Sequence, residues 1–529
     1  MADWTCDHSG TTYSDQEPFE DIDDQEECPV CHRKCPKGGG KPPSKKAKSA
    51  LPLPLIVGIG VLLLLAGVIY LLTKKTPPIP PEPSPSLSSS PIVPSSPLPT
   101  NSPNTSNSPN TSNLPTTSSG ETRLIVGQSN PDTENGINAF KSGNWTEATQ
   151  AFTKAIQGVR TNPEPQIYLN NAKARQAGSP FLIAVVTPID NAQSSAEEML
   201  RGVADAQTKF NDGGGLNGRL VEVMIANDGN DPTRAASIAQ QLANDPNVLG
   251  VIGHNASDAS KAALAEYEKA GLAMISPTST SIELKGDVFT RTVPSDAVSG
   301  QKLAEYAKNG LKLQKVAVFY NPKSSYSKSL EQAFATQFQQ KEGQIVKTID
   351  LSSGSFEPLT ELVGLQGQAQ GLVLLPDTDH TTVANGIAVA NSKLQPAQRF
   401  KLLGGDAFYN PTTLTAGGNA VQGLSLVVPW VARTPYAKTA ENRWGGQVSW
   451  RTAMSFDAGS ALIKALSVSP SRSSVLQALK ATNLPSSETS GDAVKFNANG
   501  DRVIQPLIVR VAPGSRGPQG SKFEFKAVN

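Results

Sequence analysis

From residue 181 onward, short apolar runs rich in β-branched residues alternate with stretches whose apolar positions recur every three or four residues. The short runs predict buried strands, and the longer spacing predicts helices that bury one face. Strands that alternate with helices are typical of a parallel α/β sheet. The predicted strands are 181–186, 220–226, 248–253, 272–276, 315–320, 344–351, 371–376 and 401–405, and the first predicted helices are 196–210, 232–243 and 256–270. Because a second series of alternating strands and helices begins at residue 315, we expect two α/β lobes.

Residues 130–178 show helical periodicity ahead of the first of these strands. Their small and aromatic residues follow the order A-x3-G-x-W-x2-A-x3-F-x2-A-x7-P, which includes Trp145, Phe152 and Pro163 and resembles one tetratricopeptide unit. A single unit has no neighbouring repeat to cover its apolar face. We therefore expect a helical hairpin docked on the following domain, with an independent partner-binding module as the alternative.

An uncharged apolar run at residues 51–72 is long enough to cross the roughly 30 Å hydrocarbon core of a bilayer as a helix. A cleaved signal peptide would have a shorter apolar region, nearer the N-terminus and followed by a small-residue cleavage site. We therefore expect one uncleaved transmembrane helix. Basic residues are denser before the run than after it, so residues 1–50 should form a cytoplasmic head and the rest should lie outside.

Residues 73–125 are rich in proline, serine, threonine and asparagine, and the sequence SPNTSN occurs twice in succession at 102–113. Glu82 is the only charged residue between residues 76 and 120. Such a composition cannot bury enough apolar surface to fold. We expect a disordered spacer that holds the lobes away from the membrane.

All four cysteines lie in the cytoplasmic head, so the rest of the chain can form no disulfide. Cys28, Cys31 and Cys35 have a spacing at which thiolates can share one tetrahedral zinc ion, and Cys6 or His8 can complete the set. A zinc ribbon usually has two Cys-x-x-Cys pairs and this head has one, so unliganded cysteine in a disordered head stays open as the alternative. We predict a structural zinc at these cysteines and no cofactor for the two lobes.

The charge is nearly balanced, with 47 basic and 46 acidic residues, which disfavours a nucleic-acid-binding protein with a global basic surface. The chain contains no G-x-S-x-G elbow, Walker phosphate loop or HExxH motif. His254 precedes Ser257 by three residues, but no third group that would orient the histidine is evident. This favours a polar histidine at the rim over a catalytic base, and we do not expect an enzyme.

Polar side chains gather where the predicted strands end, which is where open α/β sheets bind ligands. Ser257 follows the third strand at the start of a helix, whose free N–H groups favour an anion such as a carboxylate. Ser279 and Thr280 follow the fourth strand, and Tyr326 and Asp406 follow strands of the second lobe. Each of these residues alone is more typical of a cap, a loop or a turn.

Together, these residues and motifs resemble the type I periplasmic binding protein family, particularly Leu/Ile/Val-binding proteins, and also the amino-terminal domains of class C amino-acid receptors. The resemblance covers about residues 181–510, through VIGHNASDAS, AGLAMISPTST, FTRTVPSDAVSGQKLAEY, SYSKSLEQAF and VKFNANGDR. It implies an α/β, two-lobed clamshell at 180–529. Lobe I would take about 180–295 and 430–495, lobe II would take about 296–429, and the C-terminal segment would be shared.

The resemblance also implies a binding site for a free amino acid. In that family, a serine at the position of Ser257 and a threonine at that of Thr280 hold the α-carboxylate, with backbone help near Ser279. A tyrosine matching Tyr326 reaches across from the second lobe, and an acid matching Asp406 binds the ammonium group through a charge-assisted hydrogen bond.

Two departures from the family limit what the resemblance implies. This module lacks a disulfide that some relatives have near the carboxylate site, and an aromatic residue of the side-chain pocket is replaced around Thr378 and Asp379. The resemblance therefore supports the class of ligand better than the identity of the ligand.

We therefore expect a single-pass protein of the bacterial inner membrane, with a cytoplasmic N-terminus and a periplasmic or extracellular module for a branched-chain-type or similar amino acid. Its expected role is the substrate-binding component of an ABC transporter, with the permease as partner. The alternative is an amino-acid sensor coupled to the Cys-rich head. A flexible spacer transmits rigid motions poorly, which favours uptake over sensing.

Overall fold

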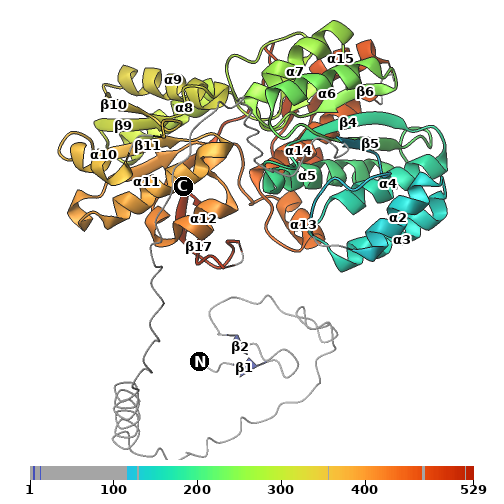
Figure 1. The fold of residues 1–529 in the computed structure, drawn as a ribbon, viewed down its shortest axis with the longest axis horizontal. Helices are drawn as coiled ribbons and strands as arrows, with labels where there is room; N and C mark the ends of the chain where they lie inside the picture. The colour runs from blue at the N-terminus through green and yellow to red at the C-terminus, as the bar shows by residue number, and fades with distance from the viewer. Residues whose placement is uncertain are drawn as a thin grey trace, which may run out of the picture. The chain divides into compact units, whose positions relative to one another are not determined.

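The computed structural model describes residues 116–127, 130–354, 357–466, 471–518 and 520–528, and a short pairing of β1 (Trp4–Thr5) with β2 (Thr12–Tyr13) (Figure 1). The chain divides into two units, residues 1–104 and 105–529, and both lobes belong to the second. The cysteine cluster, the apolar run at 51–72 and most of the expected spacer lie outside the described residues. Within the described ranges, no helix has the length and apolar character needed to span a bilayer.

Lobe I is built on a six-stranded sheet in the order β3-β5-β4-β6-β7-β8. Its strands are β3 (Thr117–Ser118), β4 (Phe181–Thr187), β5 (Val221–Asn227), β6 (Val248–Ile252), β7 (Met274–Ser276) and β8 (Phe289–Arg291). All neighbours pair in parallel except β3, which runs antiparallel to β5 at the sheet edge. The four strands predicted for this lobe are confirmed.

Helices cover both faces of the lobe I sheet (Figure 1). They are α5 (Gln193–Asp212), α6 (Pro232–Asn244), α7 (Ser257–Ala270), α14 (Trp450–Leu466) and α15 (Arg472–Lys480). Alternate residues of a strand face opposite sides of its sheet. Accordingly, Ile183 and Val185 of β4 belong to the core with α5 and α14, whereas Ala184 and Val186 belong to the core with α6 and α7.

Helices α5 and α14 approach each other very closely. A Cβ atom at Gly202 of α5 would lie 2.1 Å from the carbonyl oxygen of Thr452 in α14, so only glycine permits this contact. The contact fixes the N-terminal end of α14, and that end carries two residues of the cleft described below.

Lobe II is built on a seven-stranded sheet in the order β10-β9-β11-β12-β13-β16-β17. Its strands are β9 (Lys315–Tyr320), β10 (Gln344–Asp350), β11 (Gly371–Leu375), β12 (Lys401–Gly404), β13 (Ser425–Val428), β16 (Leu507–Pro513) and β17 (Phe523–Ala527). The strands from β10 to β13 are parallel, and β16 and β17 continue the sheet in antiparallel fashion. The four predicted strands of this lobe are confirmed, and β13, β16 and β17 are additions.

Two groups of helices enclose the lobe II sheet. Those of one face are α8 (Asp296–Glu305) and α9 (Ser325–Gln340), and those of the other are α10 (Pro358–Gly364), α11 (Thr381–Lys393) and α12 (Pro411–Gly417). The chain passes between the lobes from β8 to α8, from β13 to α13 (Pro435–Trp444), and from the β14 (Asn483–Leu484) and β15 (Val494–Lys495) pair to β16.

The segment ahead of β4 forms α2 (Pro131–Lys141), α3 (Trp145–Gly158) and α4 (Glu164–Ala177), and α4 packs against α5 and β5. The side chain of Asn171 in α4 donates to the carbonyl oxygen of Val223 at 2.7 Å and accepts from its N–H at 2.8 Å. The segment has three helices rather than the two of the expected hairpin. They are docked on lobe I, and the alternative of an independent tetratricopeptide-like module is not supported.

The expected spacer, residues 73–125, ends earlier than predicted. Residues 117–118 form β3 on the edge of the lobe I sheet, and the buried carboxylate of Glu164 accepts hydrogen bonds from the N–H groups of Leu124 at 2.6 Å and Ile125 at 3.3 Å. Contacts with lobe I hold these residues in place, and their composition gives no sign of those contacts. The predicted end of the spacer at residue 125 is therefore wrong, since residues 117–125 belong to the folded module.

Candidate ligand-binding cleft

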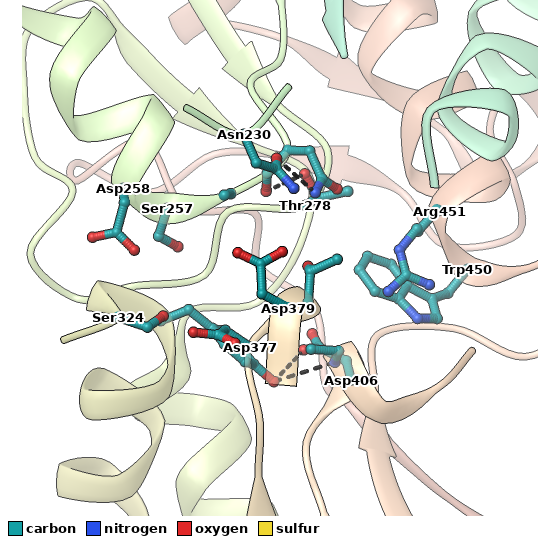
Figure 2. Close-up of a pocket in the computed structure, with 15 residues that line it drawn as sticks. Asn230, Ser257, Asp258, Thr278, Ser324, Asp377, Asp379, Asp406, Trp450 and Arg451 are labelled. Carbon is teal, nitrogen blue, oxygen red and sulfur yellow. Dashed lines mark hydrogen bonds between the residues drawn. The ribbon is translucent and has the colours of Figure 1, made fainter. Parts of the chain in front are cut away.

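A cavity of about 100 Å³ lies where the strands of both sheets end (Figure 2). Lobe I contributes residues that follow β5, β6 and β7, and lobe II contributes residues that follow β9, β11 and β12. Trp450 and Arg451, at the start of α14, complete the wall. The cavity is therefore at the edge that the sequence predicts, between two lobes that can each supply one half of a site.

The N-terminus of α7 forms the lobe I wall. Ser257 is the first residue of the helix, lines the cavity and is 2% exposed. The preceding residue, Ala256, provides no side-chain cap for the first turn. Free N–H groups at a helix N-terminus, together with a serine hydroxyl, form a site suited to a carboxylate.

The loop after β7 presents Thr278 to the cavity, whereas Ser279 and Thr280 lie behind it. The Ser279 hydroxyl is 2.7 Å from that of Ser260 and donates to the carbonyl oxygen of His254 at 3.1 Å. Thr280 Oγ1 is buried, and its interaction with the Asp296 carboxyl group lowers the pKa of that carboxyl group. The ligand roles predicted for Ser279 and Thr280 therefore stay predictions, and Thr278 is a lining residue that the sequence did not single out.

His254 is fully buried, so its predicted place at the rim is wrong. Its Nδ1 lies 2.6 Å from Asp228 Oδ2 and its Nε2 lies 3.0 Å from the hydroxyl of Tyr267. Both ring nitrogens are occupied within lobe I. The histidine ties the ends of β5 and β6 to α7, and it supports the cleft without lining it.

Asp406 forms the acidic part of the lobe II wall, directly after β12. It is 7% exposed, and its Oδ1 accepts a hydrogen bond from the Tyr326 hydroxyl at 2.7 Å. Burial raises the pKa of the Asp406 carboxyl, and the Tyr326 hydrogen bond and nearby Arg451 offset part of that rise. Tyr326 and Asp406, two of the predicted site residues, are thus hydrogen-bonded to each other in the cavity wall.

A second buried carboxyl group lies near Asp406. Asp296, the first residue of α8, is 1% exposed. Burial raises the pKa of Asp296 to about 7 and the negative charge of Asp406 adds to the rise, whereas interactions with the Ser329 and Thr280 side chains lower the pKa of this carboxyl group. A cation bound beside Asp406 would favour the ionised form of both groups.

The two lobes also touch directly beside the cavity. Asp258, the second residue of α7, accepts hydrogen bonds from the N–H of Ser325 at 3.1 Å and from its hydroxyl at 2.5 Å. The N–H of Ile282 in lobe I donates to the Ser329 hydroxyl in lobe II at 2.9 Å. These contacts hold the lobes together around the cavity.

Sequence reasoning missed several lining residues. Asn230 and Asp377 follow β5 and β11, so the strand-end argument applied to every strand would have found them. Trp450 and Arg451 begin a helix more than 150 residues from Ser257, and no local sequence signal links them to the cleft.

Comparison with known proteins links this architecture to a family. Residues 181–516 match the family model described as periplasmic binding protein. An "Amino acid binding protein" of Pseudomonas aeruginosa is 30% identical over 160 residues, which are 30% of this chain and 42% of the relative. The Leu/Ile/Val-binding protein of Escherichia coli K12 is 29% identical over 140 residues, 26% of this chain and 38% of the relative. The chain thus aligns with less than half the length of these curated relatives.

Solved structures share the two-lobed fold over nearly their full length. A leucine-binding protein LivK from Thermotoga maritima has a TM-score of 0.57 and 21% identity, covering 66% of this chain and 98% of its own. The isoleucine complex of LivJ from Streptococcus pneumoniae has a TM-score of 0.57 and 18% identity, covering 66% of this chain and 99% of its own. Identities this low establish the fold and leave the ligand open.

Proposed function

The chain belongs to the periplasmic binding protein family, with Leu/Ile/Val-binding proteins among its relatives, and we propose that its module binds a free amino acid outside the cytoplasm. One observation carries the proposal. A single cavity has an uncapped helix N-terminus with Ser257 on one lobe and the buried carboxyl of Asp406 on the other. These groups suit the α-carboxylate and the α-ammonium of one ligand.

Binding would stabilise the closed arrangement of the lobes. A ligand that contacts Ser257 and Asp406 together interacts better with the closed cleft than with an open one, and it shifts the population by that difference in affinity. Exclusion of water from the closed cleft strengthens both charged contacts. The ligand itself thus provides the energy for closure.

The proposed role is the substrate-binding component of an ABC importer, and its partner would be a permease. Relatives carry names of binding proteins rather than of enzymes, which supports a role without catalysis. The apolar run at 51–72 would anchor the chain in the inner membrane, with residues 1–50 in the cytoplasm and the spacer holding the module in the periplasm. A sensor coupled to the Cys-rich head is the alternative, supported by the cluster of cysteines itself.

Isothermal titration calorimetry with the purified protein tests the proposal. A panel of free L-amino acids should contain ligands, and the amide and the N-acetyl derivative of each ligand should bind much more weakly. Each derivative removes one of the two charges that the cavity walls meet. Equal binding of a free amino acid and its N-acetyl derivative would remove the ammonium assignment, and the absence of any amino-acid ligand would refute the proposed function.

A further inference from the structure

The cavity wall has the wrong chemistry for an aliphatic ligand side chain. The described residues of its lining include no valine, leucine, isoleucine, methionine or phenylalanine, and outside the two groups assigned to the α-carboxylate and α-ammonium they are mostly carboxylate, amide and hydroxyl. An aliphatic side chain would remove water from these groups, and it could not form hydrogen bonds in place of the ones that the water had formed.

Unpaired donors in the wall also indicate a polar ligand. Trp450 Nε1 is in a side chain that is 3% exposed and lines the cavity, and it has no hydrogen-bond partner among the described residues. Asn230 Nδ2, in the loop after β5 of the same lobe, is likewise unpartnered in the described part of the chain. Buried polar groups normally have partners, so these two donors indicate hydrogen-bond acceptors on the ligand, such as the oxygens of its α-carboxylate.

The cavity wall carries more carboxylate groups than cationic side chains. Asp258, Asp377, Asp379 and Asp406 line the cavity, and among the residues that the structure describes Arg451 is the only lysine or arginine that does so. The charge of Arg451 is already matched within the protein. Its Nη1 lies 3.5 Å from Glu198 Oε2 and donates to the carbonyl oxygen of Tyr409 at 2.9 Å, and its guanidinium lies 4.4 Å from the centre of the Trp450 ring.

Three of the four carboxylates have assigned partners. Asp258 binds Ser325 across the lobes, and Asp406 binds Tyr326 and is assigned to the ligand ammonium. Asp377 caps the short helix Thr378–His380, where its Oδ1 accepts from the His380 N–H at 3.0 Å and its Oδ2 accepts from Asn321 Nδ2 at 2.5 Å. The same Oδ1 lies 2.5 Å from Nδ1 of the His380 ring.

Asp379 has no comparable partner, because no hydrogen bond or ion pair of its carboxylate is found among the described residues. Figure 2 shows this carboxylate pointing from the short helix towards Asn230 and Thr278 of lobe I, across the cavity. Partial burial raises the pKa of Asp379, the neighbouring Asp377 carboxylate adds to the rise, and the adjacent His380 offsets part of it. A cation bound here would lower the pKa of Asp379 and favour its ionised form.

We propose that the ligand of this cleft is an amino acid with a cationic side chain of the lysine or arginine kind, and that Asp379 is the residue that selects it. The inference rests on the proposed function, since Ser257 and Asp406 are left to hold the α-carboxylate and α-ammonium. A neutral zwitterion would leave the excess negative charge of the wall unmatched, whereas a second positive charge on the ligand offsets part of it.

Matched ligand pairs test the proposal by calorimetry. L-Lysine and L-norleucine differ by the terminal ammonium, and L-arginine and L-citrulline differ in the charge of the terminal group. At least one cationic member should bind the wild-type protein about tenfold more tightly than its neutral counterpart, the ratio that corresponds to about 1.4 kcal/mol. The preference should weaken as salt is raised, because Asp379 is partly exposed to solvent.

The variant Asp379→Asn should reduce this preference to near unity. Asp350→Asn is the matched control, since Asp350 is the last residue of the lobe II strand β10 and does not line the cavity, and it should leave the preference intact. Neutral members that bind as tightly as the cationic ones, or L-glutamine that binds more tightly than both, would overturn the inference and leave amino-acid binding standing. Failure of every amino acid to bind would instead refute the proposed function.

Discussion

Replacement of Asp406 by asparagine tests the central contact of the proposed site. Asparagine preserves the shape of the side chain and can still accept the hydrogen bond from Tyr326, so the change removes mainly the negative charge. Asp406 is 7% exposed, so a ligand ammonium paired with it would be largely desolvated. Loss of one partner of such a pair costs about 2 to 4 kcal/mol, which corresponds to roughly 30-fold to 1000-fold weaker binding.

The assay is calorimetric titration of a free amino acid into wild type, Asp406→Asn and a control, Asp205→Asn. Asp205 is 6% exposed and accepts a hydrogen bond from Tyr436 at 2.9 Å, but it lies in lobe I away from the cavity. Because Asp205 does not line the cavity, the control should bind the ligand within about twofold of wild type, a change in binding free energy of roughly 0.4 kcal/mol. Thermal unfolding of all three proteins establishes that they are folded. Undiminished affinity in Asp406→Asn would refute the pairing of this carboxylate with the ligand ammonium.

Five further outcomes follow from the described contacts and from the cysteine spacing. Affinity should rise from about pH 5 to about pH 8, because the pKa of Asp296 is about 7 and a bound ammonium favours ionised carboxylates; calorimetry showing a flat profile would contradict this. Over the same range the unliganded protein should lose thermal stability, since burial raises the folded-state pKa of Asp296 above its unfolded value and that contribution disappears as the group ionises. Asp258→Ala removes the hydrogen bonds from Ser325 across the lobes, so the unliganded lobes should open further and small-angle scattering should show a larger radius of gyration. An unchanged radius would contradict a role of these hydrogen bonds in holding the lobes together. Asn171→Ala leaves both backbone groups of Val223 without this partner and should lower the free energy of unfolding by about 2 to 4 kcal/mol in urea titrations, whereas a loss below about 0.5 kcal/mol would contradict a docking role. Full-length protein should contain one zinc ion that Cys31→Ser removes, and wild-type protein free of zinc by metal analysis would leave the cysteines unliganded.

The strands of both lobes could be predicted from the sequence because a parallel strand is buried on both faces. Such a strand must be a nearly continuous apolar run, and β4, β6, β9 and β11 all have this pattern. The antiparallel strands β16 and β17 are partly exposed and give a weaker signal, and β8 has only three residues. The edge strand β3 is recruited by pairing with β5 from a segment whose composition predicts disorder.

The chain by itself determined that Ser257, Tyr326 and Asp406 follow strands and therefore meet at one edge of their sheets. Only the tertiary structure decided which neighbours join them. The path of the loop after β7 turns Thr278 rather than Ser279 towards the cavity, and the close packing of α14 on Gly202 brings Trp450 to the wall. Strand ends are local consequences of hydrophobic patterning, whereas the direction of a loop side chain and the register of two distant helices depend on packing between segments that the sequence pattern does not connect.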